Sequence, residues 1–274
     1  MVSTSAQHPR LAQIEAARLR FVPVCAALLL ALVAAVLPPD ALRPLNLVGY
    51  AVCHRIPERS FFINQRQLPV CARDTGMFTG ALAGLIVAAL TLRKRASGFP
   101  TRPYAVVFGL CFAAWAFDGF NSYVMLITRQ PLFYLPQNWL RLVTGAFMGV
   151  SLSTYVVALI NQALWRDAVP DATVSSWGDV ARLAGLAGII VAVVLWQPDV
   201  LYGPIAALSS AGVLTLLGVV NGLLVLIATK RHGLLERWSQ TLGAGVLGLI
   251  LTVAEILMID LLRAAATGGA GWPL

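Results

Sequence analysis

A short polar segment, residues 53–74, gathers side chains whose types can bind metals or anions. It holds Cys53, His54, Arg59, Cys71 and Arg73, and it leads directly into an apolar stretch. Thiolates and imidazoles are preferred ligands of zinc and related transition metals, whereas a guanidinium binds phosphate or carboxylate through paired hydrogen bonds. A solvated loop rich in basic residues would have the same composition. The segment therefore predicts either a ligand-binding site or an ordinary solvated loop.

The two cysteines of this segment, Cys53 and Cys71, allow three interpretations. In a loop outside the cytoplasm they would form a disulfide, because that compartment is oxidising. Together with His54 they would instead bind a metal ion, either zinc or another transition metal. They can also be buried thiols that do not interact. The other cysteines, Cys25 and Cys111, lie in apolar stretches and are expected to pack in the interior.

Polar and ionisable residues also occur inside apolar stretches, where a charge is costly unless it is paired. Asp118 and Glu255 are the clearest cases. Asn121 shares a helix face with Asp118, and Asn138 shares one with Arg141, because the members of each pair are three residues apart. These residues are functional candidates. Three others are expected only to pack or to reach toward the membrane surface. They are Asn221, Asp260 and Arg263.

The elements that carry these residues are predicted from the composition. The chain is 58% hydrophobic and only 12% charged, against about 25% charged residues in soluble domains. A helix that spans a bilayer needs about 20 apolar residues, and about seven stretches qualify. Backbone groups in hydrocarbon must be satisfied within their own segment, so the expected fold is an all-α bundle of transmembrane helices. The predicted spans are 19–37, 70–92, 104–127, 138–164, 181–198, 201–228 and 241–262.

The distribution of charge predicts the orientation of the chain. The net charge is +8, but the basic residues lie in short loops between apolar stretches, so nucleic acid is excluded as a partner and the lipid bilayer is expected. Most of them fall on the side of the N-terminus, which predicts a cytoplasmic N-terminus and an extracytoplasmic first loop. We expect a mobile tail over residues 1–18, one transmembrane domain over 19–264 and a C-terminal tail over 265–274.

This topology brings the candidate residues to one side of the membrane. The first loop, Asp118, Arg141 and Glu255 all fall in the outer half of the predicted bundle. We therefore expect one polar cavity that opens to the outside. Within it, Asp118 is expected to pair with Arg141, Arg73 or Arg59, because an unpaired carboxylate at that depth is unfavourable.

Four motifs carry a resemblance to a known family. They read Cys-His-x-x-Pro-Glu-Arg-Ser from Cys53, Pro-Val-Cys-Ala-Arg-x-Thr-Gly from Pro69, Asp-Gly at Asp118 and Asn-x-x-Arg-x-x-Thr-Gly from Asn138. In this order, over roughly residues 45–150, they resemble the membrane protein family catalogued as domain of unknown function 2085. The resemblance implies a small multi-pass protein of a prokaryotic cytoplasmic membrane. It implies no established activity.

One position departs from the pattern of that family. The family usually has a cysteine where this chain has Asp74, so that its Cys-His pair and its Cys-x-x-Cys pair offer four ligands of the kind found in zinc sites. The corresponding set here is Cys53, His54, Cys71 and Asp74. Aspartate is less favoured in a closed structural zinc site. The change therefore places a disulfide slightly ahead of a metal, and it is also compatible with a more open metal site.

Three classes of function follow from these residues. The preferred one is binding or transport of a small anionic or metal-linked ligand. The first alternative is a membrane enzyme that acts on a lipid phosphate, with His54 and Asp118 as the catalytic candidates. The second alternative is an accessory subunit of a larger membrane complex. The candidate ligands of an anion or lipid phosphate are Arg59, Arg73, Asn138 and Arg141.

Overall fold

A computed structural model describes residues 25, 28–34, 39–90 and 95–269, and within these the chain is a bundle of helices. The predicted N-terminal tail and most of the predicted span 19–37 lie outside the described residues. Short 3-10 turns and two small two-stranded sheets lie at the ends of the bundle. The α-helices are α2 (Leu45–Val52), α3 (Ala72–Leu90), α4 (Arg102–Thr128), α5 (Asn138–Leu164), α6 (Trp177–Trp196), α7 (Tyr202–Ala228) and α8 (Leu242–Thr267).

Five stretches of the described chain are long and apolar enough to cross a membrane. They are centred on α4 to α8, which confirms an all-helical fold with candidate membrane-spanning helices. The helix α3 is shorter and begins with Arg73 and Asp74, and it contains several glycines. The total of seven spans stays a prediction, as does the side of the membrane on which the N-terminus lies. The helix α8 continues to Thr267, five residues beyond the predicted end of the last span.

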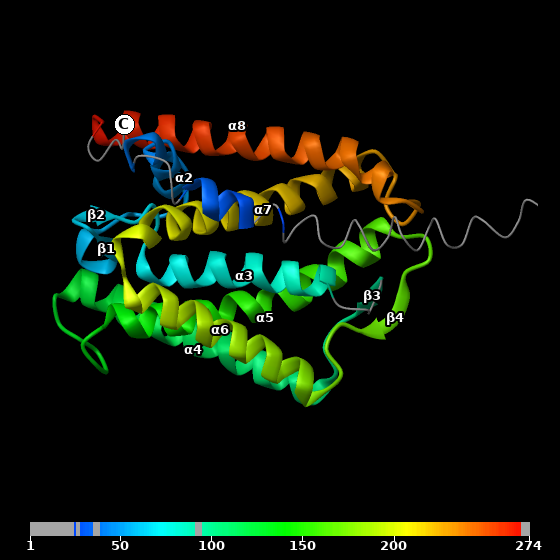
Figure 1. The fold of residues 1–274 in the computed structure, drawn as a ribbon, viewed down its shortest axis with the longest axis horizontal. Coiled ribbons are helices and arrows are strands. Elements are labelled where there is room, and N and C mark those ends of the chain that lie inside the picture. The colour runs from blue at the N-terminus through cyan, green and yellow to red at the C-terminus, as the bar shows by residue number, and fades with distance from the viewer. Residues whose placement is uncertain (1–24, 26–27, 35–38, 91–94, 270–274) are drawn as a thin grey trace, which may run out of the picture.

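The helix α3 lies in the middle of the bundle (Figure 1). It packs on α5, α6 and α7, while α4 packs on α5, and α8 packs on α7 and α2. The polar first loop, the α4–α5 loop and the C-terminal end of α8 gather at one end of the bundle, which we call the first-loop end (Figure 1). The strands β3 (Ala96–Gly98) and β4 (Val169–Ala172) lie at the opposite end.

The contact between α3 and α5 depends on glycine. A Cβ atom on Gly145 would lie 2.1 Å from the carbonyl oxygen of Arg73, and one on Gly76 would lie 2.4 Å from that of Leu142. Only a residue without a side chain lets the two backbones approach this closely. These glycines are therefore used for packing between helices of the same chain. The close approach fixes the first turn of α3 against the first turns of α5.

The opposite end of the bundle is tied together by charged and aromatic side chains. Arg95 forms an ion pair with Asp167 and lies over the ring of Trp165, with 4.4 Å between its guanidinium carbon and the ring centroid. Arg166 pairs with Glu236 at 2.6 Å. The parallel pairing of β3 with β4 also joins the α3–α4 connection to the α5–α6 connection. These contacts hold the α3–α4, α5–α6 and α7–α8 connections against one another.

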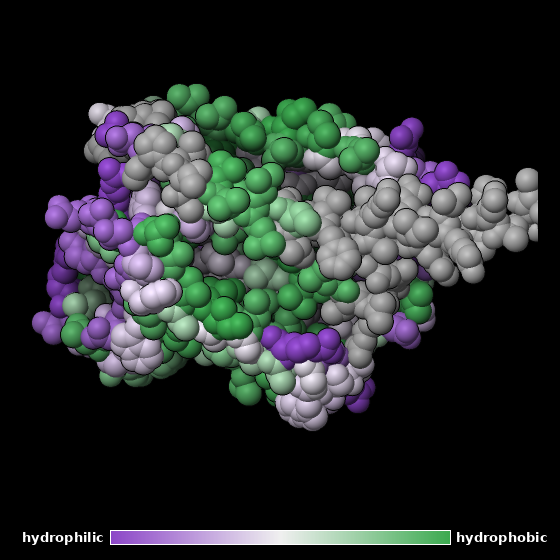
Figure 2. Space-filling view, viewed as in Figure 1, coloured by the Kyte–Doolittle hydropathy of each residue, from purple (hydrophilic) through white to green (hydrophobic). Residues whose placement is uncertain are grey.

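Apolar side chains cover the middle of the visible face, and hydrophilic residues gather at the first-loop end (Figure 2). The outer helices α4 and α8 carry many of the exposed apolar side chains. Lipid tails would cover such a belt, because exposed apolar area of this extent is unfavourable in water. Examples are Val106, Leu110, Phe120, Val246, Ile250, Leu257 and Leu262.

Candidate functional site

The first loop is a folded structure. Cys53 caps the C-terminal end of α2, and a 3-10 turn η2 (Pro57–Arg59) follows. The strand β1 (Phe62–Ile63) then pairs with β2 (Arg66–Gln67) in a small hairpin. The side-chain amide of Gln67 donates to the carbonyl oxygen of Arg55 at 2.9 Å and to the hydroxyl of Ser60 at 2.8 Å. The chain then returns through buried Leu68 and Val70 to α3. The segment is therefore an ordered loop with a partly buried interior.

Three arginines from different elements converge at this end of the bundle, and we call Arg59, Arg73 and Arg141 the arginine cluster. All three contact Ser122 of α4. Arg59 donates to its carbonyl oxygen at 2.7 Å, and the guanidinium groups of Arg73 and Arg141 donate to its hydroxyl at 3.1 and 3.3 Å. Arg141 also donates to the side-chain oxygen of Asn138 at 2.7 Å. A single serine thus joins the first loop, α3, α4 and α5.

The carboxylate of Asp118 neutralises one member of the cluster. Its Oδ2 forms an ion pair with Arg73, as the sequence predicted, and its Oδ1 accepts a hydrogen bond from the hydroxyl of Tyr134 at 2.7 Å. The side chain of Asp118 is 2% exposed and that of Arg73 is 16% exposed. This ion pair is therefore enclosed, and the cavity open to the outside stays a prediction.

The charges of the arginine cluster are not balanced by the carboxylate that contacts it. Arg59 has a lowered pKa, because its guanidinium is partly buried and lies close to the positive charge of Arg73. The Nε of Arg73 is buried and has no hydrogen-bond partner in the described chain. An excess of positive charge with an unused donor is an arrangement that an anion would stabilise.

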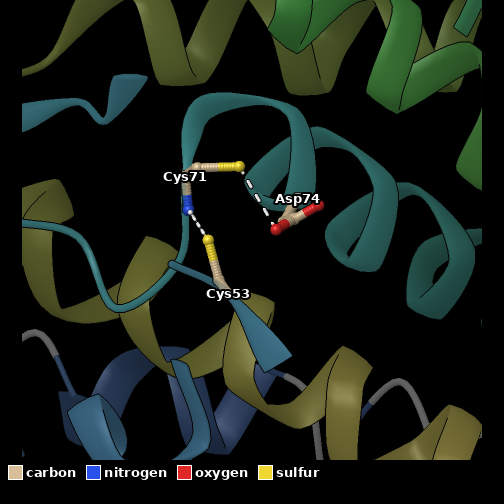
Figure 3. A group of neighbouring side chains, drawn as sticks. All are labelled: Cys53, Cys71 and Asp74. Carbon is tan, nitrogen blue, oxygen red and sulfur yellow. Dashed lines mark hydrogen bonds between the residues drawn. The ribbon is translucent and has the colours of Figure 1, made fainter. Parts of the chain in front are cut away.

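Next to this cluster, a thiol–carboxylate group lies where the first loop meets α3 (Figure 3). The backbone N–H of Cys71 donates to the sulfur of Cys53 at 3.4 Å, and the thiol of Cys71 donates to Asp74 at 3.2 Å. The sulfurs and a carboxylate oxygen lie within 4.8 Å of one another. Both cysteines are free thiols, so the disulfide favoured from the sequence is not formed in this structure.

The contact between Cys53 and Cys71 shifts the pKa values of the two thiols in opposite directions. Hydrogen bonding to Cys71 lowers the pKa of Cys53. The same contact, together with burial, raises the pKa of Cys71 well above its ordinary value. Cys53 is therefore the thiol of this pair that loses its proton first, and a thiolate is the form that binds a metal.

His54 does not join either group of side chains. It is exposed, and it is absent from the described residues whose ligand atoms gather around Cys53 and Cys71. The carboxylate of Asp118, the other catalytic candidate, instead binds Arg73 and Tyr134. The described side-chain contacts therefore do not include a four-ligand set with His54. They also do not include a contact between His54 and Asp118.

The predicted amide candidates hold loops in place. Asn121 donates to the carbonyl oxygen of Tyr134 at 2.9 Å and accepts from the N–H of Phe133 at 3.0 Å. Asn138 donates to the carbonyl oxygens of Glu58 and Ser60, each at 3.2 Å. Asn121 therefore shapes the α4–α5 loop, and Asn138 anchors the first loop to α5. The role of Asn138 as an anion ligand stays a prediction.

Glu255 was expected to share the polar cavity, and this expectation is wrong. Its carboxylate accepts a hydrogen bond from Asn221 of α7 at 2.8 Å. The same Asn221 amide donates to the hydroxyl of Thr252 at 3.0 Å. The helix α8 packs on α7 and α2, whereas the arginine cluster lies among α3, α4, α5 and the first loop.

Sequence reasoning missed Ser122 and Tyr134. Ser122 follows Asp118 by four residues, so helical spacing alone places both on one face. That spacing was a usable signal, because a hydroxyl one turn from a buried acid is well placed to join its hydrogen bonds. Tyr134 lies in an irregular loop, and no periodicity indicates where its side chain points.

Comparison with known proteins supports the resemblance drawn from the motifs. Residues 53–155 match the model of a family described as predicted membrane protein (DUF2085). An uncharacterised protein of Methanocaldococcus jannaschii is 28% identical over 115 residues, which cover 42% of this chain and 67% of that protein. No solved structure matches. The matched region contains the arginine cluster, Asp118 and the thiol–carboxylate group, and it ends within α5.

Proposed function

We propose that this membrane protein binds an anionic ligand at the first-loop end, through the arginine cluster. The observation that supports this most directly is the convergence of three guanidinium groups on Ser122, with Asp118 as the acid in direct contact. Mutual repulsion of these cations is relieved by a negative group placed among them.

The geometry favours a phosphate or carboxylate group as the ligand. A guanidinium has five N–H donors in a planar fork that matches both groups. Arg59 is partly exposed and belongs to the first loop, so it is the member of the cluster that a ligand meets first. Arg141 is 6% exposed and is held by Asn138, so it offers a fixed donor behind Arg59.

The place of the cluster beside an apolar belt is suited to two sources of this chemistry. A lipid headgroup would present its phosphate at the membrane surface, and a dissolved anion would come from the aqueous side. In both cases binding is the first step, and transport or chemistry on a lipid phosphate would follow it. Docking of an acidic partner subunit would use the same charges.

The test is a binding titration of the purified full-length protein in detergent, with inorganic phosphate as the probe. Each charge-assisted hydrogen bond is worth about 1.5–3 kcal/mol, so Arg59→Gln is expected to weaken binding by roughly ten- to a hundredfold. Arg141→Gln should act in the same direction. Arg129→Gln is the matched control, because Arg129 is exposed at the same end and lies outside the cluster.

A second titration separates the two sources. Nanodiscs of phosphatidylcholine, with and without added phosphatidic acid, present a lipid phosphate to the same residues. Tighter binding to phosphatidic acid than to inorganic phosphate would identify the headgroup as the ligand. Equal binding by wild type, Arg59→Gln and Arg141→Gln in both assays would refute the anion site.

A second candidate function is metal binding by Cys53, Cys71 and Asp74. Two sulfurs and a carboxylate within 4.8 Å are a donor set that fits zinc or a similar transition metal and leaves one position open. Elemental analysis of the purified protein tests it. We expect metal bound to wild type to be lost in Cys53→Ser and Cys71→Ser and retained in Cys111→Ser. Absence of metal from the wild type, after incubation with zinc, would remove this candidate.

A further inference from the structure

Asp260 of α8 is an acid that neither candidate function uses. Asp260 is 0% exposed, and neither of its carboxylate oxygens has a hydrogen-bond partner within the described chain. From its place in an apolar stretch, Asp260 was expected only to pack or to reach toward the membrane surface. A polar side chain that is fully buried and unpartnered inside a membrane helix is instead a position where a ligand is expected.

Apolar side chains pack one helical turn before Asp260. Ile256, one turn earlier on α8, forms a buried cluster with Val48 of α2 and Val213 of α7. The two helices packed against this part of α8 contribute two titratable side chains, Tyr50 and Tyr202, and no charged ones. A tyrosine is neutral at neutral pH. Asp260 therefore faces no cation from α2 or α7.

The charged groups of α8 itself are engaged elsewhere. Glu255 is hydrogen bonded to Asn221. Arg263 lies three residues after Asp260, which is close enough for an ion pair on a helix. Its guanidinium instead donates to the carbonyl oxygens of Tyr50 at 2.5 Å, Cys53 at 2.8 Å and His54 at 3.3 Å.

The same guanidinium also lies 4.0 Å from the centroid of the Tyr50 ring. Arg263 thus holds the C-terminal end of α2 and the start of the first loop. These contacts use the donors that a carboxylate at Asp260 would otherwise attract. The structure therefore combines a buried carboxyl group with a neighbouring cation whose hydrogen bonds go to backbone carbonyl oxygens.

We infer that Asp260 is a proton-binding site and that it carries its proton in this conformation. A bare carboxylate in apolar surroundings is so unfavourable that the group takes up a proton instead. Loss of that proton would create a negative charge one turn from Arg263. The guanidinium would then be drawn from the carbonyl oxygens of α2 toward Asp260. This inference does not depend on the proposed anion site.

Carbodiimide labelling tests the proton site. Dicyclohexylcarbodiimide partitions into apolar regions and reacts with protonated carboxyl groups, and mass spectrometry locates the adduct. In the full-length protein in detergent, we expect an adduct on Asp260 that falls as pH rises and disappears in Asp260→Asn. Glu255→Gln is the matched control and should keep it. A folded wild type that gives no adduct on Asp260 at any pH would overturn the proton site.

Hydrogen–deuterium exchange tests the link to Arg263. After correction for the intrinsic effect of pH, exchange of residues 45–55 should rise at high pH in the wild type. The isosteric Asp260→Asn variant cannot ionise, so the rise should be lost. An equal rise in wild type and variant would show that Arg263 does not respond to Asp260. Size-exclusion chromatography of each variant verifies that it is folded.

Discussion

Arg73 of α3 and Asp118 of α4 form a buried ion pair although 45 positions separate them in the sequence. The helix α4 packs mainly on α5, and this pair is one of the polar links from α4 to the centre of the bundle. Asp118 also binds Tyr134 and Arg73 also binds Ser122, which makes the pair the centre of a hydrogen-bond network. Its integrity should govern the stability of the whole first-loop end.

Asp118→Asn is therefore expected to destabilise the protein strongly. Removal of one partner leaves a buried guanidinium unpaired, which costs about 3–5 kcal/mol. The midpoint of thermal unfolding in detergent should fall well below that of the wild type. Asp171→Asn is the control, because Asp171 is exposed at the opposite end. Similar midpoints for the two variants would show that the pair contributes little.

The ionisation of Tyr134 should report the same network. Burial, together with the hydrogen bond to Asp118, raises the pKa of Tyr134 from 10.0 to about 12. A tyrosine whose pKa is higher in the folded state stabilises that state below its unfolded pKa, and this contribution is lost as pH rises from 10.0 toward about 12. The tyrosinate absorbance of wild type minus Tyr134→Phe gives the titration of this group. A midpoint near 10 in that difference would contradict the burial and the hydrogen bond.

Gly145→Ala should weaken the contact between α3 and α5. The added methyl group would lie 2.1 Å from the carbonyl oxygen of Arg73, so one of the helices must move. Overpacking of this kind costs about 1–3 kcal/mol. Gly109→Ala is the comparison, since a Cβ there has no neighbour within 4 Å. The two variants are to be compared by thermal unfolding, and an unchanged midpoint for Gly145→Ala would argue against the close approach.

Asn138→Ala should loosen the first loop without unfolding the bundle. The amide of Asn138 donates to two carbonyl oxygens of that loop, and each such hydrogen bond is worth about 1 kcal/mol. Hydrogen–deuterium exchange of residues 56–62 should increase, while that of α7 stays the same. Gln137→Ala, at an exposed neighbouring position, serves as the reference. Exchange that is equal in both variants would show that Asn138 does not anchor the loop.

The helices could be predicted because the bilayer imposes a simple pattern on the sequence. A run of apolar residues of sufficient length gives a span, and the predicted span 138–164 coincides with α5. The ends of the helices are harder to predict where polar residues interrupt the apolar run. The helix α8 continues past Arg263 to Thr267, and Arg263 donates to the carbonyl oxygen of Tyr50 in α2.

The candidate site could be predicted only in part. The pairing of Asp118 with an arginine follows from the cost of an unpaired acid in a membrane, and the structure confirms Arg73 as the partner. The separation of Glu255 from that site could not be foreseen, because depth in the membrane does not tell on which side of the bundle a helix lies. The exposure of His54 could not be predicted either. A motif gives the order of residues, whereas the direction of a side chain depends on how the loop folds.

The ion pair between α3 and α4 also has a consequence for assembly. A ribosome delivers α3 to the membrane before α4 has been made. During that interval Arg73 lacks the carboxylate of Asp118, and a lone arginine is unfavourable in hydrocarbon. Arg73 must therefore remain near the aqueous edge of the bilayer until α4 enters. Insertion of α4 then supplies that carboxylate, so the ion pair can form only after α4 has been made.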